Sequence, residues 1–141
     1  MTNLDIRIRE NFDRQAMMQT LGAKLTRVAP GEIEISAPIL PLATQQQGFG
    51  HAGLTFSIGD SAAGYAALTL LPEDSDVVTS EIKINLLAPA VGDRLIARGR
   101  VVRPGKRLIV VLSEVFAVTD GREKQIALMT GTMVPIPKTR G

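Results

Sequence analysis

The sequence predicts an α+β fold in which an antiparallel sheet wraps around one long central helix. Residues 52–71 have helical periodicity but are apolar on nearly every side, which is typical of a helix enclosed by protein. Four strand-like segments follow with no helix between them, which favours antiparallel over parallel pairing. With 141 residues and 45% hydrophobic content, residues 1–141 suit a single domain with one core.

The N-terminal segment is predicted to be one amphipathic helix over residues 4–20. Its apolar residues recur at roughly helical spacing, with charged residues between them, and Gly22 ends the helix. These apolar residues are Leu4, Ile8, Phe12 and Met17. A first hairpin follows, with strands at 23–28 and 32–36 joined by a Pro-Gly turn.

Four strands are predicted after the central helix. Residues 77–87 alternate, with Ile82, Ile84 and Leu86 on one face, and residues 93–102 repeat the alternation. Strands at 108–118 and 125–134 flank an Asp-Gly pair, which is a hairpin signal. The tail at 135–141 is expected to be frayed.

The central helix combines small residues with one acid. Gly and Ala residues in its middle allow a sheet to approach closely, which must offset the cost of about 1 kcal/mol for each of Gly59 and Gly64. Asp60 lies in this apolar segment, where an unpaired charge is costly. Two interpretations stay open: a structural acid that pairs with a backbone or basic group, and a catalytic acid or base. The predicted core face of the central helix consists of Leu54, Ile58, Ala62, Tyr65 and Leu68.

Composition excludes several classes of function. No cysteine is present, so disulfides and thiolate chemistry are excluded, and a single histidine argues against a transition-metal site. The net charge of +2 is small and its basic residues are scattered, which argues against nucleic-acid binding. No apolar run is long enough to cross a membrane, and the charged start of the chain lacks the apolar stretch of a signal peptide. The absence of cysteine fits the predicted cytoplasmic location.

Several segments together resemble the hotdog-fold thioesterases, specifically the PaaI-like acyl-CoA thioesterases. The similarity covers nearly the whole chain, and its strongest part is the Gly-Phe-Gly-His-Ala-Gly loop followed by Asp60 nine residues after His51. The other parts are the Met-Met-Gln-Thr-Leu-Gly end of the first helix and residues 79–85 leading to an Ala-Pro-Ala turn. The family has Gly where this chain has Ala52, but alanine keeps the backbone N–H.

The resemblance implies hydrolysis of an acyl-CoA to a carboxylic acid and free CoA, with no cofactor and no metal. Asp60 corresponds to the catalytic acid, acting as nucleophile or as the base that activates water. Ala52 or Gly53 corresponds to the backbone donor that polarises the thioester carbonyl. A helix N-terminus suits that task because its free N–H groups carry partial positive charge.

Further site residues are implied by the same resemblance. His51 opens the helix as a positioning residue, and its ring either bonds a loop carbonyl or contacts substrate. Gln45 falls where many relatives have an Asn or Gln that holds the substrate or the attacking water. Thr79 falls where some relatives have a Ser or Thr that helps to position that water. The basic turn of Arg103, Gly105, Lys106 and Arg107 is either a solvated turn or a contact for the phosphates of CoA.

The spacing along the helix has a physical consequence of its own. Ala52 and Asp60 are eight residues apart, so they are separated by roughly 12 Å along the axis. One helix cannot bring both groups to the same carbonyl carbon. If they act together, they must come from two antiparallel copies across a two-fold axis, which predicts a homodimer. The resemblance alone adds a homotetramer made of two dimers.

Two other functions stay open at this point. A hotdog dehydratase or hydratase is disfavoured because those enzymes pair a His with an acid at other spacings, and this chain has one His. A non-catalytic acyl-CoA-binding hotdog protein belongs to a different class. Few aromatic residues leave the acyl group open among aryl, medium-chain and hydroxylated groups.

Overall fold

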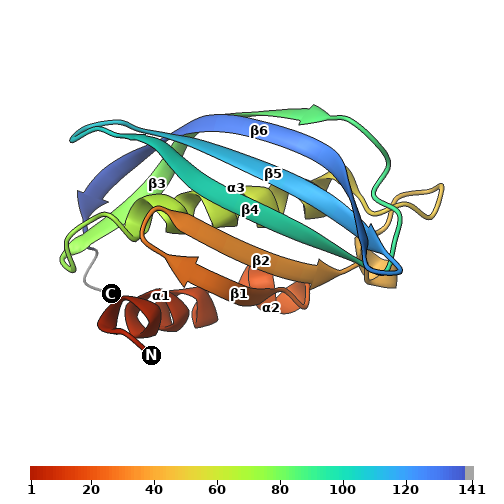
Figure 1. Ribbon diagram of the computed structural model, residues 1–141, viewed down its shortest axis with the longest axis horizontal. Helices are drawn as coiled ribbons and strands as arrows, with labels where there is room; N and C mark the ends of the chain where they lie inside the picture. Colours follow the sequence, from red (N-terminus) through yellow and green to blue (C-terminus); the bar gives the residue numbers. More distant parts are fainter. Residues whose placement is uncertain (139–141) are drawn as a thin grey trace.

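A computed structural model describes residues 1–138 and shows a curved six-stranded sheet around a central helix (Figure 1). The strand order is β1-β2-β4-β5-β6-β3, and every neighbouring pair is antiparallel. The predicted α+β fold is therefore confirmed. The helices are α1 (Asn3–Asp13), α2 (Ala16–Thr20), η1 (Pro41–Ala43) and α3 (Ala52–Leu68). The strands are β1 (Lys24–Ala29), β2 (Glu32–Pro38), β3 (Ser75–Leu86), β4 (Arg94–Pro104), β5 (Ile109–Thr119) and β6 (Arg122–Pro137).

The N-terminal segment forms two helices, so the single predicted helix over 4–20 is wrong. α1 ends at Asp13, and Gln15 has extended backbone before α2 begins. The side chain of Gln19 donates to the Asp13 carbonyl at 2.7 Å, which satisfies one carbonyl left free at the end of α1. The break changes the chain direction, so that Phe12 and Met18 are both buried in the core.

The predicted strands are confirmed, with their ends shifted by a few residues. Asp120 and Gly121 both have positive φ, at 51° and 77°, which is the geometry expected of a tight hairpin. The last strand is longer than expected, because Pro137 pairs with Ser75. The predicted fraying is therefore wrong for 135–137, while 139–141 lie outside the described residues.

Small residues let the sheet approach α3 closely. A Cβ at Gly99 of β4 would overlap the backbone of Ala62, and a Cβ at Gly59 of α3 would overlap the sulfur of Met129. The predicted core face of α3 is buried, with Ile58 and Ala62 fully inaccessible to solvent. Close packing thus offsets the low helix propensity of Gly59.

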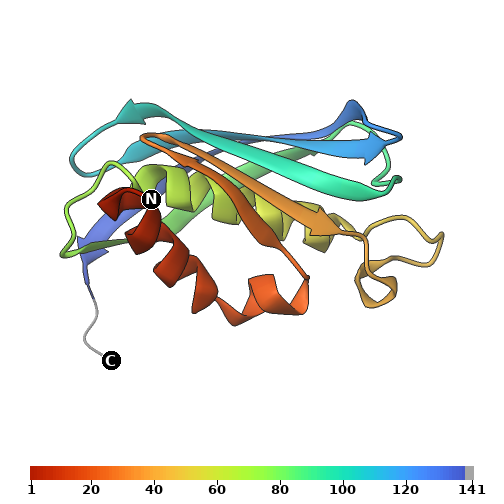
Figure 2. The same cartoon turned by 60° about the horizontal axis from the view of Figure 1, so that its bottom comes forward.

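One stripe of α3 is left partly uncovered, so a single subunit does not enclose the helix on all sides. The sheet covers one side of α3, and α1 lies beside its C-terminal half (Figure 2). There the ring centres of Phe12 and Tyr65 are 5.8 Å apart. Arg7 of α1 also donates to the carbonyls of Leu68 and Leu71 at the end of α3. No described element covers the remaining stripe. Its half-buried members are Phe56, Ser57, Asp60 and Gly64.

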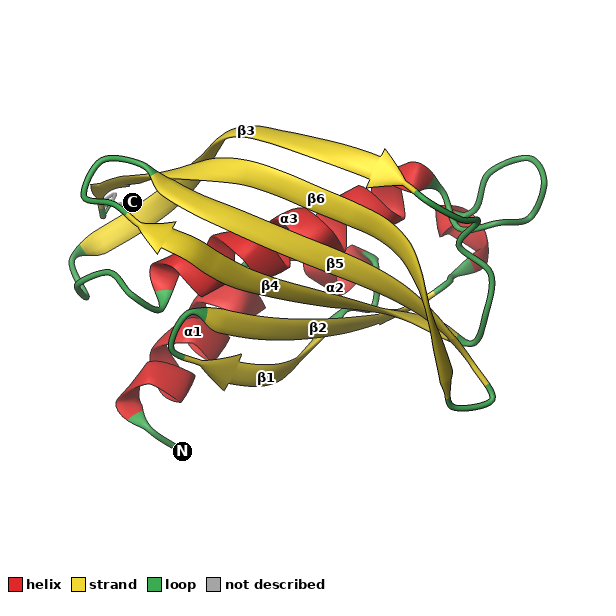
Figure 3. Cartoon of the chain, turned by 45° about the horizontal axis from the view of Figure 1, so that its top comes forward, coloured by secondary structure: helices red, strands yellow, loops and turns green. Residues whose placement is uncertain are grey.

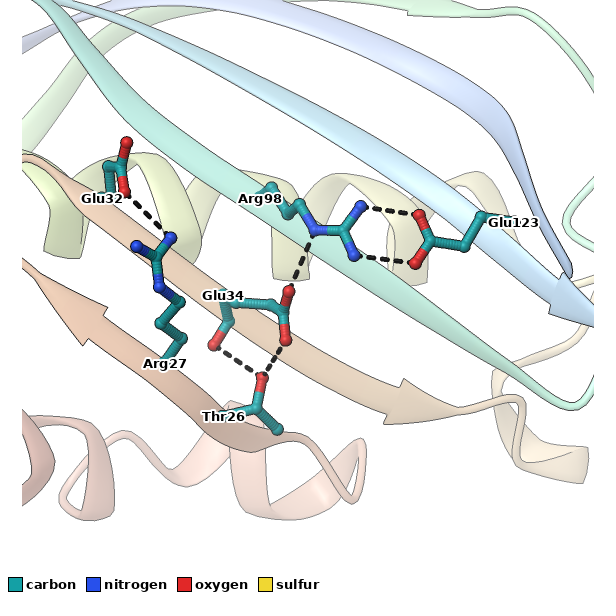
Figure 4. Close-up of polar contacts among 6 residues, drawn as sticks. All are labelled: Thr26, Arg27, Glu32, Glu34, Arg98 and Glu123. Carbon is teal, nitrogen blue, oxygen red and sulfur yellow. Dashed lines mark hydrogen bonds and ion pairs between the residues drawn. The ribbon is translucent and has the colours of Figure 1, made fainter. Parts of the chain in front are cut away.

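A network of polar side chains crosses the face of the sheet away from α3 (Figure 4). Arg98 of β4 donates to Glu34 of β2 at 2.9 Å and makes two bonds to Glu123 of β6 at 2.7 and 2.8 Å. Its guanidinium group lies 5.0 Å from the ring centre of Phe116 on β5. The hydrogen bonds from Arg98 hold the pKa of Glu123 below its usual range. The network therefore links four neighbouring strands.

Candidate active site

The start of α3 is built by His51 and by the loop before it. The N–H of Gly53 donates to Nδ1 of the His51 ring at 2.7 Å, so the ring is the side-chain cap of the helix. This bond differs from the predicted bond to a loop carbonyl. Backbone bonds from His51 to Ala43 and from Gly50 to Ala90, both 2.8 Å, fix the loop in place.

Ala52 carries the free donor at this helix start. Its N–H has no hydrogen-bond partner anywhere in residues 1–138, and the residue is exposed. The N–H of Gly53 is already bonded to His51. Of the two predicted oxyanion donors, the structure thus leaves Ala52 available for a substrate oxygen.

Gln45 folds its side chain back into its own loop. Its amide oxygen accepts from the N–H of Gln47 at 2.5 Å, and its amide nitrogen donates to the Gln47 side chain at 3.0 Å. Gly48, with φ at +85°, completes this turn. Gln45 lines a pocket of about 520 Å³ at the start of α3 together with His51 and Ala52. The structure therefore brings these three predicted site residues together.

Asp60 lies in a different pocket, farther along α3. This pocket has a volume of about 260 Å³ and contains both Asp60 and Thr79. The Thr79 hydroxyl donates to Oδ1 of Asp60 at 2.7 Å and also lies 3.3 Å from the sulfur of Met133. No basic group of the described chain lies within 4.0 Å of Asp60, so the ion-pair form of the structural interpretation is wrong.

A β-bulge turns Thr79 toward Asp60. The register of β3 with β6 shifts between Thr79 and Glu81, which leaves Ser80 as an extra residue. Val77 before the bulge and Ile82 after it therefore both pack on the core, although strict alternation would separate them. Thr79 consequently shares the face of β3 that is turned toward α3.

The Asp60 pocket also contains polar residues that the sequence analysis did not identify. The Tyr65 hydroxyl donates to Asn11 at 3.0 Å, and the Ser61 hydroxyl donates to Gln15 at 2.9 Å. The first pair joins α1 to α3, and the second joins α3 to Gln15, the residue just before α2. The sequence carries one signal for these contacts. Asn11 and Gln15 are four residues apart, and so are Ser61 and Tyr65, and in a helix this spacing places two side chains on the same side. Asp76 lines the same pocket.

Tyr65 provides a direct spectroscopic test of this pocket. Burial, together with the nearby charge of Asp76, raises the pKa of Tyr65 to about 12. The protonated phenol is therefore favoured in the folded state, and its contribution to stability is present below pH about 10 and lost as the pH rises through about 12. Tyr65 is the one tyrosine and there is no tryptophan, so phenolate absorbance reports this residue alone.

We expect the absorbance of the folded protein to change with a midpoint near pH 12, against about 10 in denaturant. Circular dichroism over the same range checks that the protein stays folded. Asp76→Asn should lower the midpoint, because it removes a negative charge that disfavours the phenolate. A folded-state midpoint near the denatured value would contradict the buried position of this ring.

The basic turn lies apart from both pockets. Arg103, Gly105, Lys106 and Arg107 line neither the Asp60 pocket nor the helix-start pocket of the same subunit. Figure 1 shows the β4–β5 turn at the left end of the sheet, whereas α3 starts at the right end. Contact between this turn and CoA stays a prediction.

The described residues contain neither a metal-ligand cluster nor a helix that could span a membrane. Across residues 1–138, no group of three His, Cys, Asp or Glu side chains is placed to hold a metal ion. None of the helices in that range is long and apolar enough to cross a membrane.

A sheet wrapped around a helix, with an acid and a free helix start on that helix, defines the class of hotdog thioesterases. The thioesterase superfamily pattern matches residues 47–124. A thioesterase family protein from Silicibacter pomeroyi is 41% identical, with a TM-score of 0.93 over 96% of this chain and 99% of that one. A provisionally named esterase of Saccharolobus solfataricus is 30% identical over 94% of this chain and 85% of its own length.

The chain therefore belongs to the thioesterase superfamily and is a thioester hydrolase. The PaaI protein of the Escherichia coli phenylacetic acid degradation operon is 24% identical over 96% of this chain and 95% of its own, with a TM-score of 0.85. That likeness shows a shared fold. Membership of the thioesterase superfamily disfavours both alternative functions, namely a dehydratase or hydratase and a binding protein without turnover.

Proposed function

We propose that the chain hydrolyses acyl-CoA thioesters at sites shared between the two subunits of a homodimer. One observation carries the proposal: Asp60 and the free N–H of Ala52 lie on one helix but line separate pockets. Their separation of roughly 12 Å along the axis prevents joint action within one subunit. Two antiparallel copies of α3 would bring the acid of one subunit to the donor of the other.

The edge of the sheet supports a dimer. β3 pairs with β6 on one side and has no strand on its other side among the described residues (Figure 3). It is 12 residues long, and Val78 and Leu86 on it are 46% and 55% exposed. A long edge strand with apolar residues is usually protected against uncontrolled pairing. Pairing with β3 of a second subunit would cover this edge and place the uncovered stripes of two α3 helices near one another.

The proposed chemistry uses two protein groups. Asp60 either accepts a proton from the water that attacks the thioester carbonyl, or attacks it directly to form an anhydride that water then cleaves. The carbonyl oxygen gains negative charge in both cases and accepts a hydrogen bond from the N–H of Ala52. The carbon–sulfur bond then breaks, and the CoA sulfur leaves with the electron pair and takes up a proton.

Supporting roles follow from the observed contacts. The hydroxyl of Thr79 holds one oxygen of Asp60 and leaves the other free, so Thr79 is a positioning residue for the acid. His51 fixes the helix start by capping Gly53. Gln45 shapes the loop beside Ala52 and can contact substrate only through the remaining hydrogen of its amide. The tetramer, the cytoplasmic location and the CoA contact of the basic turn stay predictions.

A free-thiol release assay with a panel of acyl-CoAs tests the proposed function. We expect CoA release with at least one acyl-CoA at a rate proportional to enzyme, together with a dimer in sedimentation at micromolar concentration. A simple non-CoA thioester of the same acyl group serves as the matched control for CoA recognition. Saturable binding of acyl-CoA without release, or full activity in a monomer, would refute the proposal.

A further inference from the structure

Gly64 is a glycine that packing within the subunit does not require. A glycine inside a helix costs about 1 kcal/mol relative to alanine. At Gly59, the other predicted glycine of α3, the cost is offset, because an added Cβ would overlap the sulfur of Met129. At Gly64 an added Cβ would meet a single neighbour, the terminal methyl of Met133 at 3.9 Å, which is an ordinary contact. The missing side chain therefore needs another explanation.

The position of Gly64 supplies that explanation. It lies one helical turn after Asp60 on the same side of α3 and lines the same pocket of about 260 Å³. The pocket extends from the acid toward the C-terminal half of the helix, because its other α3 residues, Ser61, Tyr65 and Leu68, all follow Asp60. A side chain at position 64 would project into the space next to the acid.

The Asp60 pocket is better suited to the acyl group than to the CoA arm. It has about half the volume of the pocket at the start of α3, where the larger arm would pass. Four of its polar side chains are paired with one another, Tyr65 with Asn11 and Ser61 with Gln15, so these four do not require a polar substrate. Asp76 also lines the pocket, and one of its oxygens accepts from the N–H of Val77. Four residues of helix advance about 6 Å, and an extended chain advances about 3.8 Å over three bonds, so Gly64 lies beside roughly the fifth or sixth acyl carbon.

We infer that Gly64 is a specificity-determining residue, which keeps the acyl pocket open beyond roughly the fifth carbon of the acyl chain. The inference rests on the proposed acyl-CoA hydrolase function. A methyl group at position 64 narrows the pocket for longer acyl groups and leaves the acetyl group untouched. The size of the acyl group that the enzyme accepts is then set by the absence of one side chain.

Gly64→Ala and Gly64→Leu test this inference in kinetics with straight-chain acyl-CoAs from acetyl to octanoyl. We expect Gly64→Ala to lower kcat/KM for octanoyl-CoA relative to acetyl-CoA by roughly tenfold or more, since one misplaced methylene group has effects of this order. Gly64→Leu should shift the limit to still shorter chains. Ser57→Ala is the matched control, because Ser57 lies on the same stripe but does not line the pocket, and its chain-length profile should stay that of the wild type.

Thermal unfolding and sedimentation of the same variants separate specificity from packing. Gly64→Ala should keep or raise Tm, because alanine favours the helix, and should keep the dimer. An equal loss for all chain lengths with a lower Tm or a weaker dimer would overturn the inference in favour of packing between subunits. An unchanged chain-length profile in both variants would also overturn it. If the wild type releases CoA from no member of the panel, the proposed function itself fails.

Discussion

Replacing Asp60 with asparagine is expected to lower turnover by roughly 10²- to 10⁴-fold with little change in stability. Asparagine keeps the size of the side chain and can still accept the hydrogen bond from Thr79, which is 2.7 Å long in the wild type. It removes the negative charge and with it the base or nucleophile. Because Asp60 has no cationic partner among the described residues, its loss leaves no stranded charge. Steady-state thioester hydrolysis and thermal unfolding are measured on the same preparation.

Asp76→Asn is the matched control for Asp60→Asn. Asp76 is a second carboxylate in the same pocket, so its replacement removes the same charge without removing the proposed catalytic group. We expect a much smaller fall in turnover. Equal losses in the two variants would indicate a general electrostatic effect and not a base or nucleophile. A clear loss of stability in Asp60→Asn, with activity lost only through unfolding, would instead show a structural role.

Replacing Ala52 with proline is expected to reduce kcat by roughly 10²- to 10³-fold, the usual effect of removing one oxyanion donor. Proline lacks the N–H, and it is well tolerated at the first position of a helix. The residue before it, His51, has φ of −64° and ψ of 145°, which is the conformation that proline favours in its predecessor. The helix should therefore persist while its free donor is lost. Ala52→Gly, which keeps the N–H, is the control and should retain most of the activity.

The choice of position matters for this experiment. Proline at Gly53 would force Ala52 out of its helical conformation and break the cap on His51, so it would not isolate the donor. Full activity in Ala52→Pro, with circular dichroism unchanged, would rule out the N–H of Ala52 as the oxyanion donor. Subunit mixing then tests the shared site. Mixed Asp60→Asn and Ala52→Pro subunits should regain one working site per heterodimer, and no recovery in a mixture shown to exchange subunits would argue against it.

The sequence by itself determined the elements whose signals are local. Periodicity identified the core face of α3, alternation identified the strands, and the Asp-Gly pair marked the last hairpin. The spacing of Ala52 and Asp60 fixed their separation along the axis, because a helix advances by a constant rise per residue. If the two groups act together, the prediction of a shared site follows from that spacing. The resemblance to hotdog thioesterases added the roles of these residues, and the comparisons confirmed the family.

The tertiary structure alone decided how the candidate site is assembled. The bulge at Ser80 turns Thr79 toward Asp60, and it depends on the register between β3 and β6, which local alternation does not reveal. The uncovered stripe on α3 depends on where the sheet and α1 end, so the composition of the helix suggested full burial instead. Asn11 reaches the pocket from α1, which packs beside α3, and Gln15 reaches it from the break between α1 and α2. Each of these features arises from contacts between segments distant in the sequence, and such contacts leave no periodic pattern within either segment.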